Sequence, residues 1–376
     1  MKIKMALMLI VFVAFHNLKA QNINREVFTD MELKNSRRIL EVPNIDHYIT
    51  IKGDFHIHTI FSDGNVWPTT RVDEAWADGL DAIAISDHDI YRPHQQYLNA
   101  DHHTSYEIAK SYAAEKNIIL IKAIEITKWE MPPGHLNALF IKNGNLPEMN
   151  DATEAGLMTY IEKLYQQDAF ILWNHPGWAA QQKDTVLWFD FHQNLLDKGW
   201  LKGVEVFNYN EWYPVALRWA VTKGLAPFAN TDIHEPIRWT YGHDDDFIRP
   251  MTLVFAEQRT EESIHKAMNE KRTVAWFHRH LAGEETLLGK LFDKSLTARE
   301  IFSGKGKKII EITNATDFHF QLRSLSKEWD HPLEIQRRSV VSVKVPDVLK
   351  TIKVEVLNWH IDAEKNLIRE ISLPVK

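Results

Sequence analysis

The stretch GDFHIHTIFSDG, residues 53–64, places two histidines on alternate positions and an aspartate shortly after them. The alternation of His56 and His58 with Phe55 and Ile57 predicts a β-strand, in which side chains two residues apart point to the same face. Two neutral imidazoles directed to one point make a poor core but half of a metal site. In a chain with 19 histidines such a pair also arises by chance, so a metal site requires further ligands elsewhere.

The composition is typical of a folded protein without a general attraction to nucleic acid. The 376 residues are 44% hydrophobic and 11% aromatic, which is enough for one large domain and a small one. The formal net charge of −7 provides no basic surface for a nucleic-acid backbone. We therefore expect a small-molecule partner rather than a DNA or RNA polymer. The sequence predicts no particular oligomeric state.

Residues 1–20 have the pattern of a signal peptide. Two lysines precede the apolar run Met5–Phe15, which is too short to span a bilayer, and cleavage after Ala20 fits the pattern. Residues 21–49 would then lead into the folded part. The chain contains no cysteine, so neither a disulfide nor a cysteine-linked lipid anchor is expected. We expect a periplasmic or secreted protein of bacterial type with no membrane anchor.

From residue 50 to 284, short β-like runs alternate with amphipathic helical runs. The β-like runs after the first are GLDAIAIS, NIILIKAIEIT, AFILWNHP, GVEVFN and LAPFANTD. This order predicts right-handed βα units around a mainly parallel sheet. Several such units in succession favour an α/β fold of the TIM-like barrel type or a near relative.

Residues 285–376 follow a different pattern. KKIIEITNAT, HFQLRSL, SVVSVKV and TIKVEVLNW are short alternating runs separated by polar turns. We therefore predict a small immunoglobulin-like β-sandwich after the first domain.

Nearly every predicted strand of residues 50–284 ends in residues that bind metals. Besides His56 and His58, these are Asp63, Asp87, His88, Asp89, Glu125, His135, His175, Asp232 and His234. In a barrel of parallel strands all carboxyl ends open at one rim, so these side chains would meet in one pocket. Clustered carboxylates repel one another, and bound cations reverse that cost. The pattern therefore predicts a metal site.

The motifs DFHIHTIFSDG, ISDHD, AIEIT, GH, NHP and TDIH resemble, in order, those of the PHP (polymerase and histidinol phosphatase) family, which is similar to the amidohydrolases. The resemblance covers about residues 50–280. It implies a distorted (β/α)7 barrel whose site holds two to three divalent metals and hydrolyses phosphoesters. The mixture of imidazoles and carboxylates suits zinc, manganese or iron better than calcium.

The resemblance also implies a role for each residue. A first metal would be bound by His56, His58 and Asp232, and Glu125 would bridge it to a second metal completed by His135 and His175. A third would be held by Asp63, His88 and His234, with an aspartate at position 63 where other members have histidine. The catalytic role falls to Asp232, Glu125 and His234, and Asp87 would orient an imidazole from behind.

Three residues beside these loops are candidate substrate contacts: Arg92, Arg238 and Trp178. A guanidinium can hold a phosphate with two hydrogen bonds, but either arginine could equally form a surface salt bridge, which is the preferred interpretation for Arg238. Trp178, like Trp129 and Trp239, could stack on a base or a sugar, although more aromatic residues pack in cores than bind ligands.

These observations predict an exported metal-dependent phosphoesterase that hydrolyses a small phosphate mono- or diester with a metal-bound hydroxide. Two alternatives stay open. One is hydrolysis of a C–N or C–O bond, as in the amidohydrolases, and the other is a non-catalytic binding protein on the same scaffold. A ligand-capable residue at every expected position argues against the second alternative.

Overall fold

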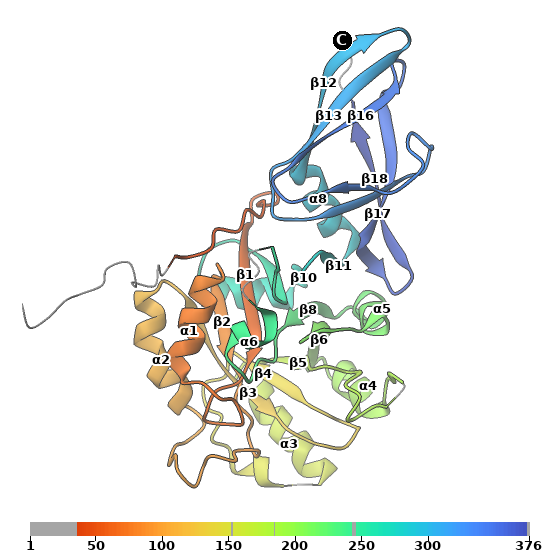
Figure 1. The fold of residues 1–376 in the computed structure, drawn as a ribbon. Helices are drawn as coiled ribbons and strands as arrows, with labels where there is room; N and C mark the ends of the chain where they lie inside the picture. Colours follow the sequence, from red (N-terminus) through yellow and green to blue (C-terminus); the bar gives the residue numbers. More distant parts are fainter. Residues whose placement is uncertain (1–35, 152, 184, 243–245, 374–376) are drawn as a thin grey trace, which may run out of the picture. The chain divides into compact units, whose positions relative to one another are not determined.

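The computed structural model describes residues 36–373 except residues 152, 184 and 243–245 (Figure 1). The predicted signal peptide and residues 21–35 of the predicted lead-in lie outside this part. The chain from Arg37 onward forms one unit. Within the described ranges, no helix is long and apolar enough to cross a membrane.

The part of the chain up to residue 283 alternates strands and helices. The strands are β1 (Ile49–Ile57), β2 (Ala82–Ile85), β3 (Ile119–Ile126), β4 (Leu136–Leu139), β5 (Phe170–Trp173), β6 (Leu201–Asn208), β7 (Glu211–Trp212), β8 (Ala226–Asn230), β9 (Met251–Ala256), β10 (Thr273–Phe277) and β11 (His280–Gly283). The helices are α1 (Pro68–Ala77), α2 (Thr104–Glu115), the 3-10 helix η2 (Pro147–Asn150), α3 (Glu154–Tyr165), α4 (Asp190–Asp197), α5 (Pro214–Lys223), α6 (Ile237–Tyr241) and α7 (Glu261–Asn269).

These strands form one mixed sheet, which confirms the α/β class. Parallel pairing joins β1 to β2, β2 to β3, β5 to β6 and β6 to β8. β4 runs antiparallel between β3 and β5, and β9 runs antiparallel to β1. The sheet is therefore rich in parallel pairs but less uniformly parallel than the βα rhythm predicted. β4 and β11 follow the preceding strand without a helix, and β9 and β10 pair antiparallel although α7 connects them.

The ladder does not close into the barrel that the sequence predicted. Between β1 and the end of β8 the only bridge in the described residues is Ile57 with Ile233. Side chains bind backbone amides that would otherwise pair β1 with β8. The Phe55 amide donates to Asn230 Oδ1 at 2.8 Å, and the Thr231 amide donates to Asp54 Oδ1 at 3.1 Å. Polar side chains thus replace hydrogen bonds between strands in the gap between β1 and β8, which we call the seam.

The inner face of the curved sheet carries its own apolar cluster. Phe55, Phe170 and Phe228 come from three strands and are fully buried there, together with Ile264 of α7. Thr260 caps α7 by accepting a hydrogen bond from the Ser263 amide at 3.2 Å. The ligand-capable side chains lie beyond this apolar cluster, at the carboxyl ends of the strands.

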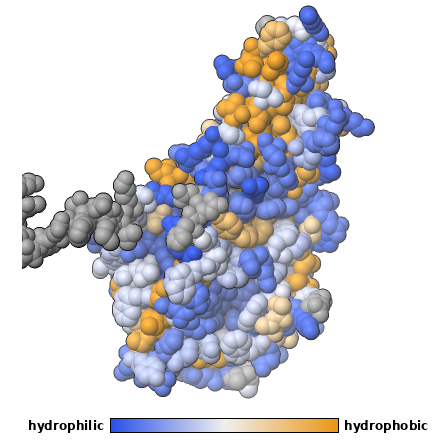
Figure 2. All heavy atoms as spheres, viewed as in Figure 1, coloured by the Kyte–Doolittle hydropathy of each residue, from blue (hydrophilic) through white to orange (hydrophobic). Residues whose placement is uncertain are grey.

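The remaining elements are α8 (Glu285–Ser295), β12 (Leu296–Gly304), β13 (Lys307–Asn314), β14 (Phe320–Ser324), β15 (Leu333–Ile335), β16 (Val340–Pro346), β17 (Thr351–Asp362) and β18 (Lys365–Ser372). The strands form two antiparallel groups, β12–β13–β16 and β15–β14–β17–β18. Figure 2 shows apolar side chains gathered in the region of the first group, where Ile301, Phe302 and Val340 are exposed. The immunoglobulin-like topology stays a prediction.

The sheet of β1 to β11 continues into the C-terminal strands. β11 pairs in parallel with β17 through Leu281 with Trp359 and Ala282 with His360, and Figure 1 shows these strands next to each other. α8, which the strand pattern after residue 285 did not predict, buries Leu288, Leu291 and Phe292 in the same core. The predicted boundary at residues 284 and 285 therefore falls within a shared core.

Candidate metal centre

Four side chains converge where β1, β3 and β8 end. The Nε2 atoms of His56 and His58 lie 3.1 Å apart, and each lies 3.1 Å from Asp232 Oδ1. Glu125 completes the group, with Oε1 at 3.2 Å from His56 Nε2 and Oε2 at 3.3 Å from His58 Nε2. The residues implied for a first metal are therefore together, and their donor atoms surround a common point.

Glu125 also faces the residues implied for a second metal. Its Oε1 lies 3.2 Å from His135 Nδ1 and 3.7 Å from His175 Nε2. The two imidazole rings have centroids 5.0 Å apart. Both carboxylate oxygens of Glu125 are thus directed at imidazole nitrogens, which is the placement a bridging ligand requires.

Asp63 is the centre of the residues implied for a third metal. Its Oδ1 lies 3.2 Å from His234 Nε2 and 3.5 Å from His88 Nε2. The donor atoms of these three residues and of His58 lie within 4.8 Å of one another. The three sets also overlap elsewhere, because His88 groups with Glu125 and His135, and His175 groups with His56 and Asp232. The cluster is continuous rather than divided into separate sites.

The charges of the cluster are mutually dependent. Burial would lower the pKa of His56, but the carboxylates of Asp232 and Glu125 raise it well above the usual value. For His88, burial is likewise outweighed by Glu125 and Asp63, which raise the pKa to about 10. Burial would raise the pKa of Glu125 and Asp232, yet the surrounding imidazoles hold it well below the usual range. The carboxylates are therefore anionic and need positive charge beside them.

Two buried carboxylate oxygens of the cluster have no hydrogen-bond partner within the described residues: Asp63 Oδ1 and Glu125 Oε2. Asp63 Oδ1 and Glu125 Oε2 approach imidazole nitrogens without the geometry of a hydrogen bond. Buried polar atoms without partners cost free energy, and a divalent cation among carboxylate oxygens and imidazole nitrogens removes that cost. The residues present therefore fit divalent metals.

Glu205 contacts two of the ligand residues on the side away from the cluster, and the sequence did not lead us to predict it. Its Oε1 lies 2.9 Å from His56 Nδ1, and its Oε2 accepts a hydrogen bond from the His175 amide at 2.7 Å. Asn208 and Asn230 donate to the same carboxylate, and Glu205 is fully buried. A lone acid in the apolar strand GVEVFN was the signal that could have identified it.

Asp87 acts on His58 rather than on its neighbour His88. Its carboxylate accepts hydrogen bonds from the Thr59 amide at 2.7 Å and from Ser62 Oγ at 2.8 Å. Ser62 Oγ in turn lies 3.2 Å from His58 Nδ1. Asp87 therefore reaches the imidazole of His58 through Ser62, because the turn after β1 folds back over Asp87.

Arg71 of α1 ties together the two loops that carry ligands. Its guanidinium is 1% exposed on the side chain and donates to the backbone oxygens of His58, Ile233, His234 and Glu235 at 2.8 to 3.0 Å. A contact of 2.7 Å with Glu74 engages its fifth N–H. The sequence pattern of α1 contained no signal for this role.

Two ligand positions have unusual backbone conformations. His175 has φ of 25° and Asp232 has φ of 52°, both in a region that residues other than glycine rarely adopt. Each costs about 1–3 kcal/mol unless its surroundings enforce it. The Glu205 contact to the His175 amide and the hydrogen bond from the Asp232 amide to the His56 oxygen provide that enforcement.

The candidate substrate residues have different positions. Trp178 lies beside the cluster, with its ring centroid 5.3 Å from that of His175 and 5.9 Å from that of His135. Arg92 donates to the backbone oxygens of Phe61 and Ala100 at 3.0 Å and lines a neighbouring cavity. Arg238 lies 3.8 Å from Asp78, at the end of α1 away from the metal-binding side chains, as the salt-bridge interpretation requires.

The fold and the site together define an α/β protein with a buried imidazole and carboxylate cluster suited to divalent metals. No family model and no curated protein matches the chain. Among solved structures, it is similar to a two-domain protein from Bacteroides vulgatus described as containing a predicted PHP-like metal-dependent phosphoesterase, with 36% identity, a TM-score of 0.85, and coverage of 90% of this chain and 99% of that one. The chain therefore belongs to the family of PHP-like predicted metal-dependent phosphoesterases, as the motifs indicated.

Two more distant structures also match. A putative metal-dependent phosphoesterase from Bifidobacterium adolescentis has 16% identity and a TM-score of 0.40 over 58% of this chain and 96% of its own. An amidohydrolase from Chromobacterium violaceum has 14% identity and a TM-score of 0.38 over 60% of this chain and 97% of its own.

Proposed function

We propose that the protein is an exported phosphoesterase that hydrolyses a small phosphate mono- or diester at a site of two to three divalent metals. The observation that carries the proposal is the convergence of His56 Nε2, His58 Nε2, Asp232 Oδ1 and the Glu125 carboxylate at separations of 3.1 to 3.3 Å. Zinc, manganese and iron suit this donor set. The predicted leader, residues 1–20, supports export.

Bound cations would supply charge to stabilise the phosphoryl oxygens and would lower the pKa of a water in the site. The residues of the chain hold the reacting groups in place. Glu125 links the first two ligand sets through its two oxygens, and Asp232 links His56 with His58. We assign the catalytic role to Asp232, Glu125 and His234.

His234 is the proposed contact to solvent and substrate. Its side chain is 32% exposed, more than those of His56, His58 and Glu125, which are fully buried. Its Nδ1 donates to the backbone oxygen of Asp232 at 2.7 Å, and its Nε2 faces Asp63 Oδ1 at 3.2 Å. That nitrogen is available to bind a cation or to take a proton at the open side of the cluster.

A hydrolysis screen tests this proposal. The metal-loaded protein should release phosphate from at least one of a panel of small phosphate mono- and diesters, and a chelator should abolish the release. Glu125→Gln should reduce kcat/KM on the order of 1,000-fold while the protein stays folded, because one side chain links two ligand sets. Glu115→Gln, an exposed acid at the end of α2, is the matched control.

The same sample is tested with amides and lactones. Hydrolysis of these compounds with no phosphate release would replace the proposal with the amidohydrolase-like alternative. Turnover of neither class at any metal loading would favour a binding protein.

A further inference from the structure

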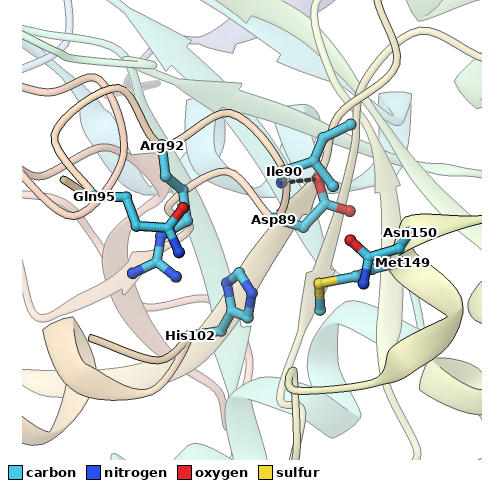
Figure 3. A pocket seen from close by; sticks show the side chains of 7 residues that line it. All are labelled: Asp89, Ile90, Arg92, Gln95, His102, Met149 and Asn150. Atoms are coloured by element: carbon cyan, nitrogen blue, oxygen red, sulfur yellow. Dashed lines mark hydrogen bonds between the residues drawn. The ribbon is translucent and has the colours of Figure 1, made fainter. Parts of the chain in front are cut away.

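A polar cavity of about 280 Å³ lies beside the cluster. Figure 3 shows Arg92 and Gln95 on one side of it, Asp89 and Asn150 on the other, and His102 between them. None of these five residues belongs to the ligand sets described above. The volume is at the lower end for a small-molecule pocket and accommodates a fragment about the size of one sugar ring.

Asp89 lies at the buried wall of this cavity. It is 3% exposed, its Oδ1 accepts hydrogen bonds from the Ile90 amide at 2.8 Å and the Thr127 amide at 3.0 Å, and its Oδ2 has no partner in the described residues. A buried carboxylate oxygen without a partner is costly, and the buried Tyr160 hydroxyl, which interacts electrostatically with Asp89, is likewise unpartnered. Asp89 directly follows His88, so the cavity and the cluster share one strand end.

The other side chains around the cavity supply both donors and acceptors. Arg92 uses Nε and one terminal nitrogen on backbone oxygens. Gln95 and Asn150 are exposed amides at the edge of the cavity. Burial and the charge of Arg92 lower the pKa of His102 to about 4, so this imidazole is neutral. A lining of one carboxyl group, one guanidinium and two amides offers both donors and acceptors to the hydroxyl groups of a ligand.

An aromatic surface joins the cavity to the cluster. Tyr91 lies in sequence between two cavity residues, and its ring centroid is 5.7 Å from that of His88 and 5.4 Å from that of Trp129. Trp129 lies 6.3 Å from Trp178. Tyr91 and Trp129 are 39% and 49% exposed. Large apolar rings left open beside a polar pocket provide a flat face for the C–H bonds of a ligand ring.

Building on the phosphoesterase function, we propose that the substrate is a phosphorylated sugar, with its hydroxyls in the cavity of Asp89, Arg92, Gln95 and Asn150, its ring against Tyr91 and Trp129, and its phosphate at the metal cluster. Planar carboxylate, guanidinium and amide groups each bind neighbouring hydroxyls in pairs, and the aromatic face excludes water from the ring. Sugar recognition and phosphate chemistry are thereby carried by different residues.

Steady-state kinetics of the metal-loaded full chain tests the proposal. Glucose 6-phosphate, mannose 6-phosphate, glycerol 3-phosphate, AMP and p-nitrophenyl phosphate form the panel. At least one hexose phosphate should have a kcat/KM about tenfold or more above that of glycerol 3-phosphate. Gln95→Ala and Asn150→Ala should each raise KM for that hexose phosphate about fivefold with little change in kcat, because each removes about one hydrogen bond. Tyr97→Ala is the control, since Tyr97 lies on the same segment and is 79% exposed.

A binding measurement separates this proposal from the phosphoesterase function. Saturation-transfer NMR with methyl glucoside and methyl mannoside on the metal-free full chain should detect binding that Gln95→Ala weakens and Tyr97→Ala does not. Binding of this kind without phosphate release from any ester would support the sugar pocket and refute the phosphoesterase function. Preference for AMP or p-nitrophenyl phosphate, with KM values insensitive to Gln95→Ala and Asn150→Ala, would overturn the sugar pocket and leave the phosphoesterase function standing.

Discussion

Glu205 illustrates what single residues contribute to the metal centre. The residue types that could bind metals were visible in the sequence, because histidines and acids at strand ends stand out from apolar strands. Among the residues that hold them, only Glu205 had a signal, as a lone acid in an apolar strand, whereas Arg71 and Asn174 become informative only when distant strand ends meet. Asn174, for instance, donates to Glu125 Oε1 at 2.6 Å across 49 positions of sequence.

The role of Glu205 as a positioning residue is testable. Glu205→Gln keeps the shape of the side chain but removes the charge that faces His56 Nδ1, so metal affinity should fall about 10- to 100-fold. Competition with a metal-sensitive dye measures the affinity, and Glu115→Gln is the control. The carboxylate would have no positioning role if both variants bound metal as the natural protein does.

His192 makes stability depend on pH. It is fully buried against Trp173, its Nε2 lies 2.9 Å from the Pro133 oxygen, and burial lowers its pKa to about 3. Between about pH 6.5 and pH 3 the unfolded chain takes up a proton that the folded chain does not, so this residue lowers stability as the pH falls through that range.

The comparison with His192→Phe isolates this contribution. Between pH 7 and pH 5, the free energy of unfolding of the natural protein should fall by about 2 kcal/mol more than that of the variant. Urea denaturation at both pH values measures the difference. Equal losses in the two proteins would mean that His192 is not held neutral in the folded state.

At the scale of elements, the βα rhythm predicted the strands that carry ligands, and these were correct. The regular alternation of strands and helices was not correct. β4 is a short strand where the sequence had suggested a loop, and α8 follows a strand directly. Turn residues, Pro132–Gly134 and Asn143–Gly144, lie on both sides of β4, but its four residues are too few to show a clear alternation. The open seam between β1 and β8 was also invisible, since Asn230 and Asp54 accept hydrogen bonds from the amides of Phe55 and Thr231, which lie 175 and 177 positions away in the sequence.

A substitution of Arg71 tests how the loops after β1 and β8 are held together. Arg71→Met removes a donor from four backbone oxygens near the ends of β1 and β8, and only those of Ile233 and His234 keep a backbone amide as a second donor. The free energy of unfolding should therefore fall by about 3 kcal/mol or more. Chemical denaturation of the metal-free protein measures it. Arg299→Met, whose side chain is 73% exposed, should change stability by less than about 0.5 kcal/mol. Similar effects of the two substitutions would refute the clamping role of Arg71.

For the whole molecule, the sheet and core are continuous from the metal-binding part into the C-terminal strands. Trp276 of β10 packs against Phe318 with ring centroids 5.0 Å apart, and Leu281 of β11 pairs with Trp359. A chain that ends at residue 284 would expose this core and should melt about 10 °C or more below the full chain. Because no C-terminal residue belongs to the ligand sets, its activity should persist at low temperature. An unchanged melting temperature would show that the two parts are independent.

The central claim is that distant imidazoles and carboxylates form one centre for divalent cations. Elemental analysis of the purified full chain, with melting curves before and after chelation, tests it most directly. We expect two to three divalent ions per chain, a lower melting temperature after chelation, and loss of ions in Glu125→Gln but not in His331→Ala, which alters an exposed histidine outside the cluster. A chain that retains no metal, and whose melting temperature does not respond to added zinc, manganese or iron, would contradict the claim.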